Sequence, residues 1–300
     1  MPASYTSELA QELAPDVLAR FLRYVQIDTQ SRRERTSSPS TPGQLDLGRL
    51  LVEELREAGL DDARLDENGY VVATLPGTSD GAGEGRAIGL IAHMDTSPDA
   101  PGHGVEPIVH LKYDGGVLSL PRAGTVLDPA AMPELAGKAG HDIVTSSGDT
   151  LLGADDKAGV AEIMAGVAHL AAHPELPRPT LRIGFTPDEE IGEGATLFDI
   201  PSFGARCAYT LDGSDLGELQ DETFSALEVI LTVHGVAVHP GWAVGKLVNA
   251  LRLAAQIVAA LPSDTLTPET TTGREGFIHP HEITGDAAQA QVRFILRDFD

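Results

Sequence analysis

The fold is decided by residues 153–190, which read GADDKAGVAEIMAGVAHLAAHPELPRPTLRIGFTPDEE. In Asp156–His173, apolar side chains recur three and four positions apart, which predicts a helix with one apolar face. The apolar run Thr180–Thr186 predicts a buried strand, and three acidic residues follow shortly after it. A helix that leads into a near-continuously apolar strand is typical of a layered α/β domain.

The segments on either side repeat this alternation. Their patterns predict amphipathic helices at 8–25 and 44–59, and buried strands at Tyr70–Leu75, Ala87–His93 and Cys207–Leu211. Residues 98–147 are rich in Gly and Pro, which predicts loops with short strands. We therefore expect residues 1–222 to form an α/β domain with a mixed, mostly parallel sheet flanked by helices.

The pattern changes after about residue 223. Apolar and polar residues alternate from Leu227 to Val233, which predicts a strand with one face in solvent. A helix is expected at 246–261, and a loop leads from it to a second alternating run, Ala288–Arg297. We expect residues 223–300 to form a smaller α+β domain. Because one helix must cover its sheet and the chain stops directly after a strand, the sequence indicates an incomplete domain.

The composition excludes several classes of protein. The 300 residues correspond to about two domains, and 21 Lys+Arg against 45 Asp+Glu give a net charge of −24. Such a chain is repelled by phosphate backbones and anionic lipid, which disfavours nucleic-acid and membrane-surface roles. The single cysteine, Cys207, excludes an internal disulfide, and its place on an expected buried strand predicts core packing. Neither a transmembrane segment nor a secretory leader pattern is evident, so a cytoplasmic location is expected.

Four polar clusters stand at or near strand ends or helix starts, where open α/β sheets bind their ligands. The clusters are His93 with Asp95, Asp155 with Asp156, Asp188 with Glu189 and Glu190, and Asp212 before a glycine. Taken singly, each has an ordinary explanation as a strand end, a helix cap, a solvated loop or an Asp-Gly turn. Taken together, they supply nitrogen and oxygen ligands for two divalent ions such as zinc, and a spare carboxylate for general-base work. The set therefore favours a metallohydrolase.

Six strings in these regions also carry a resemblance to a known family. They are AHMDTSPDAPGHGVEP (92–107), TLLGADDKAGVAEIM (150–164), FTPDEEIGEGA (185–195), YTLDGSDLGEL (209–219), VHPGWAVGKLVNAL (238–251) and ILRDFD (295–300). In this order, over nearly the whole chain, they resemble the peptidase T family of tripeptide aminopeptidases. That family belongs to the dinuclear-zinc metallopeptidases that also include glutamate carboxypeptidase.

The resemblance implies a role for each member of the clusters. His93, Asp155 and Asp212 would hold one zinc ion, and Asp155 would bridge to a second zinc ion that Glu190 also binds. Asp95 would sit behind His93, and Glu189 would act as the general base. Asp156 would have a conformational role.

The smaller domain would be the lid and dimerisation domain of the family, which implies a homodimer. His239 would help to stabilise the oxyanion, although its residue type and place equally fit a turn or a capped core histidine. Asn249 and Arg297 would contact the carboxylate end of the substrate, whereas a strand-end arginine is more often a surface salt-bridge partner. His279 and His281 are expected in a lid loop and are not assigned as ligands.

The implied activity is release of the N-terminal residue from tripeptides by attack of zinc-activated water. Members of the family take a further histidine ligand for the second zinc ion from a segment after the lid, and no residue follows Asp300 here, so the second site lacks a ligand in this chain. Alternatives are a dipeptidase, a carboxypeptidase or an N-acyl-amino-acid hydrolase of the same clan. A catalytically incomplete fragment that only binds metal or peptide is a further alternative.

Overall fold

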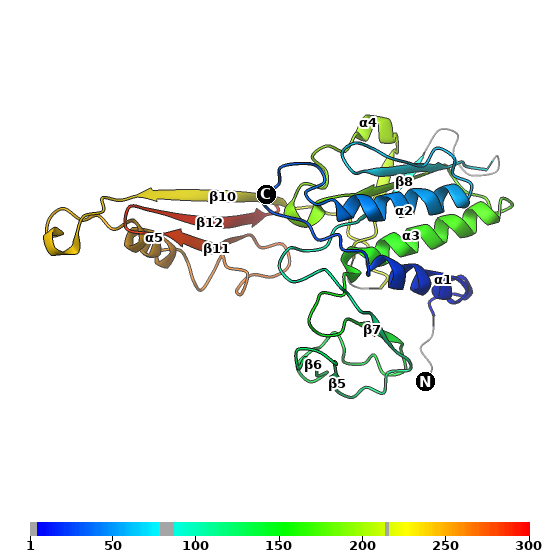
Figure 1. Ribbon diagram of the computed structural model, residues 1–300, viewed down its shortest axis with the longest axis horizontal. Helices are drawn as coiled ribbons and strands as arrows, with labels where there is room; N and C mark the ends of the chain where they lie inside the picture. The colour runs from blue at the N-terminus through cyan, green and yellow to red at the C-terminus, as the bar shows by residue number, and fades with distance from the viewer. Residues whose placement is uncertain (1–4, 79–86, 214–215) are drawn as a thin grey trace. The chain divides into compact units, whose positions relative to one another are not determined.

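The chain folds into two compact units, Met1–Leu216 and Gly217–Asp300. The computed structural model describes residues 5–78, 87–213 and 216–300, and its elements are drawn in Figure 1. Within these described residues, no helix has both the length and the apolar character that a membrane crossing requires. Each unit has its own hydrophobic core.

The first unit is built on a five-stranded sheet with the strand order β1-β2-β8-β3-β9. The strands are β1 (Arg64–Leu65), β2 (Val71–Leu75), β3 (Ile88–His93), β8 (Leu181–Thr186) and β9 (Cys207–Thr210). Strand β3 runs parallel to both β8 and β9, whereas the β1–β2 and β2–β8 pairs are antiparallel. The expected mixed sheet is therefore confirmed, but the expectation that it is mostly parallel is not, because two of its four described strand pairs are parallel and two are antiparallel.

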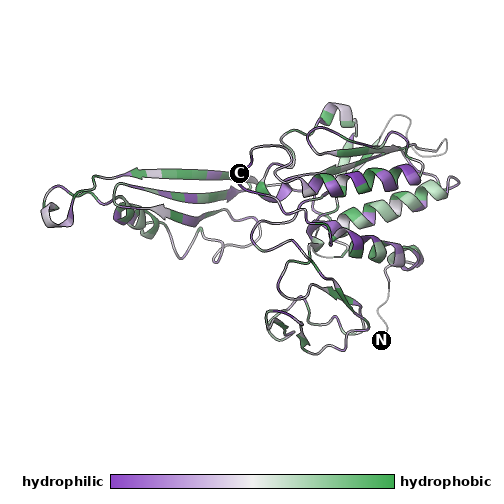
Figure 2. Ribbon diagram, viewed as in Figure 1, coloured by the Kyte–Doolittle hydropathy of each residue, from purple (hydrophilic) through white to green (hydrophobic). Residues whose placement is uncertain are grey.

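Three long helices pack against this sheet and one another. They are α1 (Glu8–Tyr24), α2 (Gly43–Glu57) and α3 (Ala154–Ala172), and each lies within two residues of its predicted range. Helix α3 packs on β3 and α1 packs on α3, while α2 contacts β1 and β2 (Figure 1). Figure 2 shows that α3 is apolar along most of its length, as expected for the helix in the middle of the core.

The opposite face of the sheet receives the ring of Phe203, which ends the short helix α4 (Ile200–Phe203). A Cβ atom at Gly89 would lie 2.7 Å from this ring, and one at Gly184 would lie 3.1 Å from it. The two glycines therefore leave the space that Phe203 fills on strands β3 and β8. Phe203 is buried as a result.

A buried carboxylate links α1 to α2. Glu54 accepts hydrogen bonds from the guanidinium groups of Arg20 and Arg23 and, at 2.6 Å, from the hydroxyl of Tyr24. Burial and the neighbouring Glu54 carboxylate raise the pKa of Tyr24, so its hydroxyl stays protonated and donates. Two cations and a hydroxyl offset the cost of placing this carboxylate in the core.

Residues 98–147 form the expected excursion of loops and short strands. Strand β4 (Ile108–His110) pairs with β7 (Ile143–Thr145), and β5 (Leu118–Ser119) pairs with β6 (Val126–Leu127). Because these strands have only two or three residues, turns and side-chain hydrogen bonds hold most of this segment.

The expectation that Cys207 is buried is wrong. The strand predicted around it exists as β9, but all four residues of β9 are exposed, Cys207 among them. In the described sheet β9 is an edge strand that pairs with β3 alone. An apolar run does not reveal whether a strand lies at the centre or at the edge of a sheet.

The second unit is a three-stranded antiparallel sheet in the order β10-β12-β11, with one helix on its face. Its elements are β10 (Ser225–His234), α5 (Ala250–Ala259), β11 (Phe277–Gly285) and β12 (Gln289–Asp298). The core lies between α5 and β12, where Ala254, Val292 and Phe294 are buried. Strand β11 occupies a region that the sequence predicted as a loop. Pro280 and a register shift between Pro280 and Glu282 interrupt the alternation of apolar and polar residues that would have predicted the strand.

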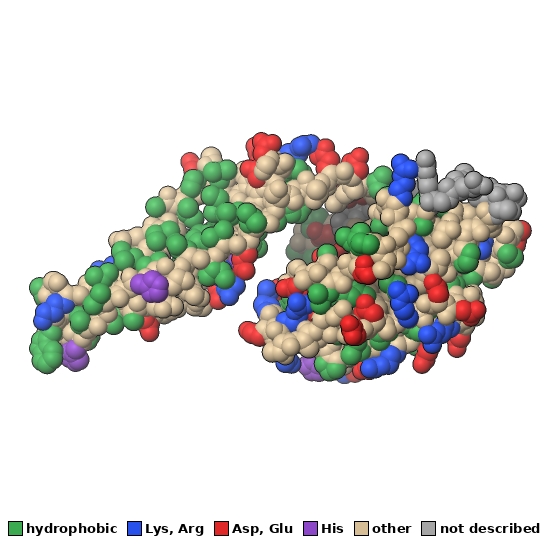
Figure 3. All heavy atoms as spheres, turned by 90° about the horizontal axis from the view of Figure 1, so that it is seen from above, with side chains coloured by type: hydrophobic (Ala, Val, Ile, Leu, Met, Phe, Trp, Pro, Cys, Tyr) green, Lys and Arg blue, Asp and Glu red, His purple; other side chains and the backbone are tan. Residues whose placement is uncertain are grey.

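Many apolar side chains of the second unit lie at its surface, as Figure 3 shows. They come from β10, from α5 and from the segment between them. The most exposed include Leu227 (65%), Trp242 (76%) and Val244 (96%). An apolar surface of this extent is typical of a region that contacts another protein surface.

Helix α3 approaches the residue after β9 so closely that only glycine fits at one position. A Cβ atom at Gly159 would lie 2.0 Å from the carbonyl oxygen of Leu211 and 2.5 Å from Oδ1 of Asp156. At Gly166, in the same helix, a Cβ atom would meet nothing within 4 Å. The two glycines thus offer a matched pair of positions.

We expect Gly159→Ala to lower the free energy of unfolding by about 1–3 kcal/mol, because the methyl group forces α3 away from Leu211. The control Gly166→Ala is expected to raise it by about 0.5–1 kcal/mol, because alanine favours the helix. Urea unfolding followed by circular dichroism measures both. Equal stability of the two variants would contradict the close contact at Gly159.

Candidate metal centre

His93 is the last residue of β3 and the centre of a polar cluster. Because β3 is parallel to β8 and β9, the residues that follow all three strands meet at the same edge of the sheet. The imidazole is buried, with Nε2 lying 2.8 Å from Oδ1 of Asp155 and Nδ1 lying 3.0 Å from the carbonyl oxygen of Asp95. One ring nitrogen thus faces the cluster and the other faces the protein.

Two carboxylates complete a compact donor set with His93. Asp155 lies at the start of α3, and Asp212 follows β9. One donor atom from each of the three side chains lies within 4.8 Å of the other two, and both carboxylates are exposed. Asp155 and Asp212 follow His93 by 62 and 119 positions in the sequence, and the sheet therefore brings distant residues together.

Asp95 joins the ends of β3 and β8. Its carboxylate is fully buried and accepts hydrogen bonds from the backbone N–H groups of Glu189 (2.9 Å) and Glu190 (3.1 Å). The same carboxylate lies 3.4 Å from Nδ1 of His93. Asp95 therefore fixes the turn after β8 and faces the inner nitrogen of His93.

Glu189 and Glu190 begin the 3-10 turn Glu189–Ile191. Oε2 of Glu189 lies 3.9 Å from Nε2 of His93, and about half of the Glu189 side chain is exposed. A carboxylate so placed borders the donor set and is still open to solvent.

Asp156 and Lys157, the two residues after Asp155, point into the protein. The carboxylate of Asp156 is buried and accepts the backbone N–H of His93 at 3.0 Å, and the Asp155–Asp156 peptide bond is cis. The ammonium of Lys157 is buried and donates to the carbonyl oxygen of Ile27 at 2.7 Å. Burial lowers the pKa of Lys157 to about 8. The sequence patterns gave no reason to single out Lys157.

The carboxylates of the cluster repel one another, which raises the pKa of some of them. Partial burial, together with repulsion from Asp155, raises the pKa of Asp212 to about 6 and that of Glu190 to about 7. Burial opposes a charge on His93, but hydrogen bonds to Asp155 and Asp95 outweigh it and raise the pKa of His93 to about 11. The surrounding carboxylates thus favour a positive charge at the centre of the cluster.

The donor set fits a divalent metal ion. An imidazole nitrogen and carboxylate oxygens are ligands that borderline ions accept, and a cation would relieve the repulsion among the acids. The inner nitrogen of His93 is held by a carbonyl oxygen and faces a carboxylate, which is the support that metal-binding histidines usually have. The described residues thus form a candidate metal centre.

Asp188, the first of the three consecutive acids, has a different environment. It is buried, and its carboxylate accepts hydrogen bonds from Ser40 and Gln44, at the start of α2. The acidic triplet is therefore divided between the donor cluster and the loop before α2. The sequence did not distinguish its members by pattern.

The predicted substrate-binding residues all belong to the second unit. Nδ1 of His239 accepts the backbone N–H of Gly241 at 3.1 Å, and Oδ1 of Asn249 caps α5 by accepting the N–H of Arg252 at 3.0 Å. The guanidinium carbon of Arg297 lies 3.2 Å from the ring centre of Phe224. His279 and His281 lie on β11, so the loop expected for them is wrong.

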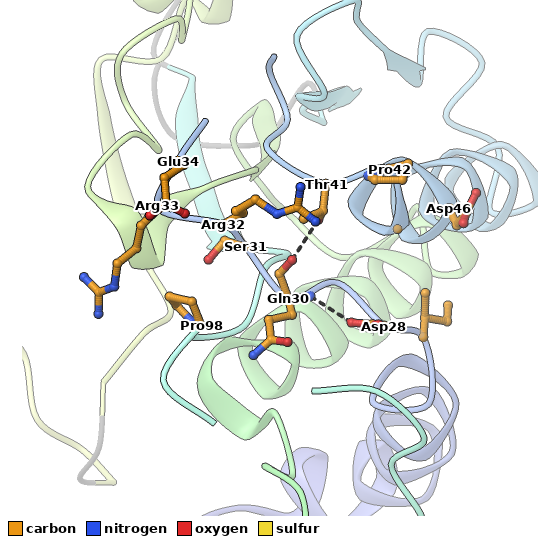
Figure 4. Close-up of a pocket in the computed structure, with 12 residues that line it drawn as sticks. Asp28, Gln30, Ser31, Arg32, Arg33, Glu34, Thr41, Pro42, Asp46 and Pro98 are labelled. Carbon is orange, nitrogen blue, oxygen red and sulfur yellow. Dashed lines mark hydrogen bonds between the residues drawn. The ribbon is translucent and has the colours of Figure 1, made fainter. Parts of the chain in front are cut away.

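A cavity of about 730 Å³ opens beside the loop that precedes α2. Figure 4 shows that it is bordered by residues between Asp28 and Asp46 and by Pro98. His93 and the carboxylates around it are not among its lining residues, so the candidate centre rests on its donor atoms and not on this cavity.

Comparisons with known proteins identify relatives of this chain. The sequence profile of the peptidase dimerisation domain matches residues 222–300. The peptidase T of Aliivibrio fischeri is 48% identical over 284 residues, which are 95% of this chain and 69% of that protein. The peptidase T of Desulfitobacterium hafniense is 51% identical over 284 residues, which are 94% of this chain and 68% of that protein. The chain thus spans about two thirds of the length of these relatives.

Solved structures share the fold. The aminopeptidase PepT of Bacillus cereus has a TM-score of 0.64 at 22% identity, over 95% of this chain and 67% of that one. A tripeptidase of Staphylococcus aureus has a TM-score of 0.64 at 20% identity, over 95% of this chain and 66% of that one.

We expect Asp155→Asn to weaken binding of Zn²⁺, used as a probe, by at least about tenfold, because the amide removes a negative donor from the cluster. Equilibrium dialysis of the purified chain measures the affinity. Asp16→Asn removes the same charge from the exposed face of α1 and is expected to leave the affinity unchanged. Equal loss in both variants would mean that net charge alone attracts the ion.

Proposed function

This chain belongs to the peptidase T family of metallopeptidases, and from that premise we propose that it hydrolyses the N-terminal peptide bond of tripeptides. The observation that carries the proposal is the convergence of His93, Asp155 and Asp212 beside the carboxylate of Glu189. Relatives named peptidase T, and a fold shared with an aminopeptidase and a tripeptidase, support the choice of substrate.

The proposal assigns His93, Asp155 and Asp212 as ligands of one zinc ion, and Asp155 with Glu190 as ligands of a second. The short distance between His93 and Asp155 and the raised pKa values of Asp212 and Glu190 support a cation among these groups. Bound zinc would supply a Lewis acid that polarises the scissile carbonyl and acidifies a water molecule. Asp95 would position His93 by holding its inner face.

Glu189 is proposed as the general base. Its carboxylate borders the donor set and is half exposed, so a substrate and a water molecule can both reach it. It would take a proton from the attacking water and give that proton to the amine nitrogen as the peptide C–N bond breaks. Its backbone is held by Asp95, which restricts where the carboxylate can go.

Residues 223–300 are proposed to act as a lid and dimerisation domain, forming a homodimer. The match to the peptidase dimerisation domain and the exposed apolar side chains of this unit support that role. Within the unit, His239 is proposed to stabilise the oxyanion, and Asn249 and Arg297 are proposed to contact the substrate carboxylate. A cytoplasmic location is also proposed, since one cysteine cannot form an intrachain disulfide.

We expect Glu189→Gln to bind as much zinc as the wild type and to lose about 10²–10⁴-fold in the rate of tripeptide hydrolysis, because the amide cannot accept a proton. Zinc content by mass spectrometry and release of the N-terminal residue are measured together. Glu193→Gln, which changes an acidic residue four positions later and just beyond this turn, is the matched control and is expected to keep full activity. Near-normal turnover by Glu189→Gln would rule out its role as base.

A substrate panel tests the reaction itself. Among a tripeptide, a dipeptide, an N-acetylated tripeptide and an N-acyl amino acid, we expect the free tripeptide to be cleaved at least tenfold faster than the others. Faster cleavage of the dipeptide or of the acylated compounds would instead identify a dipeptidase or an acyl-amino-acid hydrolase. A carboxypeptidase would release the C-terminal residue first.

A further inference from the structure

We propose that Asp188 is a positioning residue, which holds Glu189 and Glu190 at the metal centre by tying the turn after β8 to the loop before α2. The proposal rests on the proposed function, in which Glu189 is the general base and Glu190 is a metal ligand. It concerns a carboxylate that lies outside the donor cluster.

The contacts of Asp188 form a closed set. Oδ2 accepts the backbone N–H of Ser40 at 2.8 Å, and Oδ1 accepts the hydroxyl of Ser40 at 2.5 Å and the amide Nε2 of Gln44 at 2.7 Å. The backbone N–H of Asp188 donates to Oε1 of Gln44 at 3.1 Å. Asp188 and Gln44 are fully buried, so these four hydrogen bonds replace water at both residues.

The backbone of Asp188 sets the direction of the turn. Its φ of 56° lies in the left-handed region, which aspartate and asparagine tolerate better than most residues. The chain leaves β8 through this residue, and the next two N–H groups then point at the carboxylate of Asp95. The turn that carries Glu189 and Glu190 is therefore held by two buried carboxylates, those of Asp95 and Asp188.

The partners of Asp188 belong to a firmly anchored segment. A Cβ atom at Gly43 would lie 1.8 Å from the carbonyl oxygen of Asp28, so the start of α2 packs directly on the chain before the loop. The hydroxyl of Thr41 donates to the carbonyl oxygen of Gln30 at 2.8 Å, as Figure 4 shows, and Gln30 pairs with Thr96 beyond the end of β3. Asp188 thus ties the turn to a support that is itself joined to β3.

Asp188 acts through its neighbours and not on a metal ion or a substrate. Its carboxylate oxygens accept from Ser40 and Gln44, so they are already engaged within the protein. Without this tie, the turn would keep its hydrogen bonds to Asp95 and the partly exposed ion pair between Arg35 and Glu193, which is a weak constraint. A shift of about 1 Å at a catalytic group can cost about 10²-fold in rate, so a small displacement would be measurable.

Asp188→Asn is the informative variant, because asparagine keeps the size of the side chain and its tolerance of a positive φ. Its amide group would meet the donor groups of Ser40 and Gln44, which leaves a buried donor unsatisfied. Adding Gln44→Glu supplies an acceptor for that amide while still accepting the backbone N–H at position 188. The double variant thus exchanges the carboxylate and the amide between positions 188 and 44 and restores the pairing of hydrogen-bond donors with acceptors.

Two readouts separate positioning from simple destabilisation. In Asp188→Asn we expect the dissociation constant for Zn²⁺ to rise about tenfold and kcat for a tripeptide to fall about 10²-fold, with KM within about threefold. The double variant Asp188→Asn/Gln44→Glu is expected to return both quantities to within about threefold of the wild type. Tyr24→Phe, which removes the buried hydrogen bond to Glu54 between α1 and α2, controls for stability and should change neither.

The outcomes are distinguishable. Wild-type zinc affinity and kcat in Asp188→Asn would overturn the proposal, as would equal losses in Tyr24→Phe. Failure of the double variant to recover, with its melting temperature restored, would also overturn it. If the wild type binds zinc but does not cleave tripeptides, the proposed function fails, and the zinc affinities of the same four proteins still decide the role of Asp188.

Discussion

The site depends on one buried carboxylate, that of Asp95, at the junction of two parallel strands. With no water around it, this group must find its hydrogen bonds within the protein, and it finds them in the N–H groups of Glu189 and Glu190. Because it also lies beside His93, the end of β3 and the turn after β8 cannot move independently. The donor set of the centre is thus a consequence of strand pairing. Asp155 and Asp212 join it because α3 and β9 begin or end at the same edge of the sheet.

Local patterns in the sequence were enough for most of the fold. The helices and buried strands of the first unit follow from apolar spacing, which depends on neighbours within a few residues. What the sequence could not predict depends on contacts between distant segments. Cys207 has the pattern of a core residue but lies on an edge strand, and β11 was missed because Pro280 and the register shift break its alternation. The Glu54 cluster likewise exists only because α1 and α2 pack together.

The candidate site divides in the same way. The position of His93, Asp155 and Asp212 near strand ends and a helix start predicted that they could converge, and the structure brings their donor atoms together. Their individual roles came from the resemblance to a family and not from spacing. The sequence also presented Asp188 to Glu190 as one acidic run, whereas the structure separates them, because the left-handed backbone at Asp188 turns its carboxylate toward Gln44.

The exposed position of Cys207 has a practical consequence for biophysical work. It is the one cysteine of the chain and lies on an accessible strand edge of the first unit. A thiol-reactive spin label would therefore attach at a single known place without any mutation. With a second label introduced on α5, pulsed electron resonance would measure the distance between the two units with and without a bound peptide.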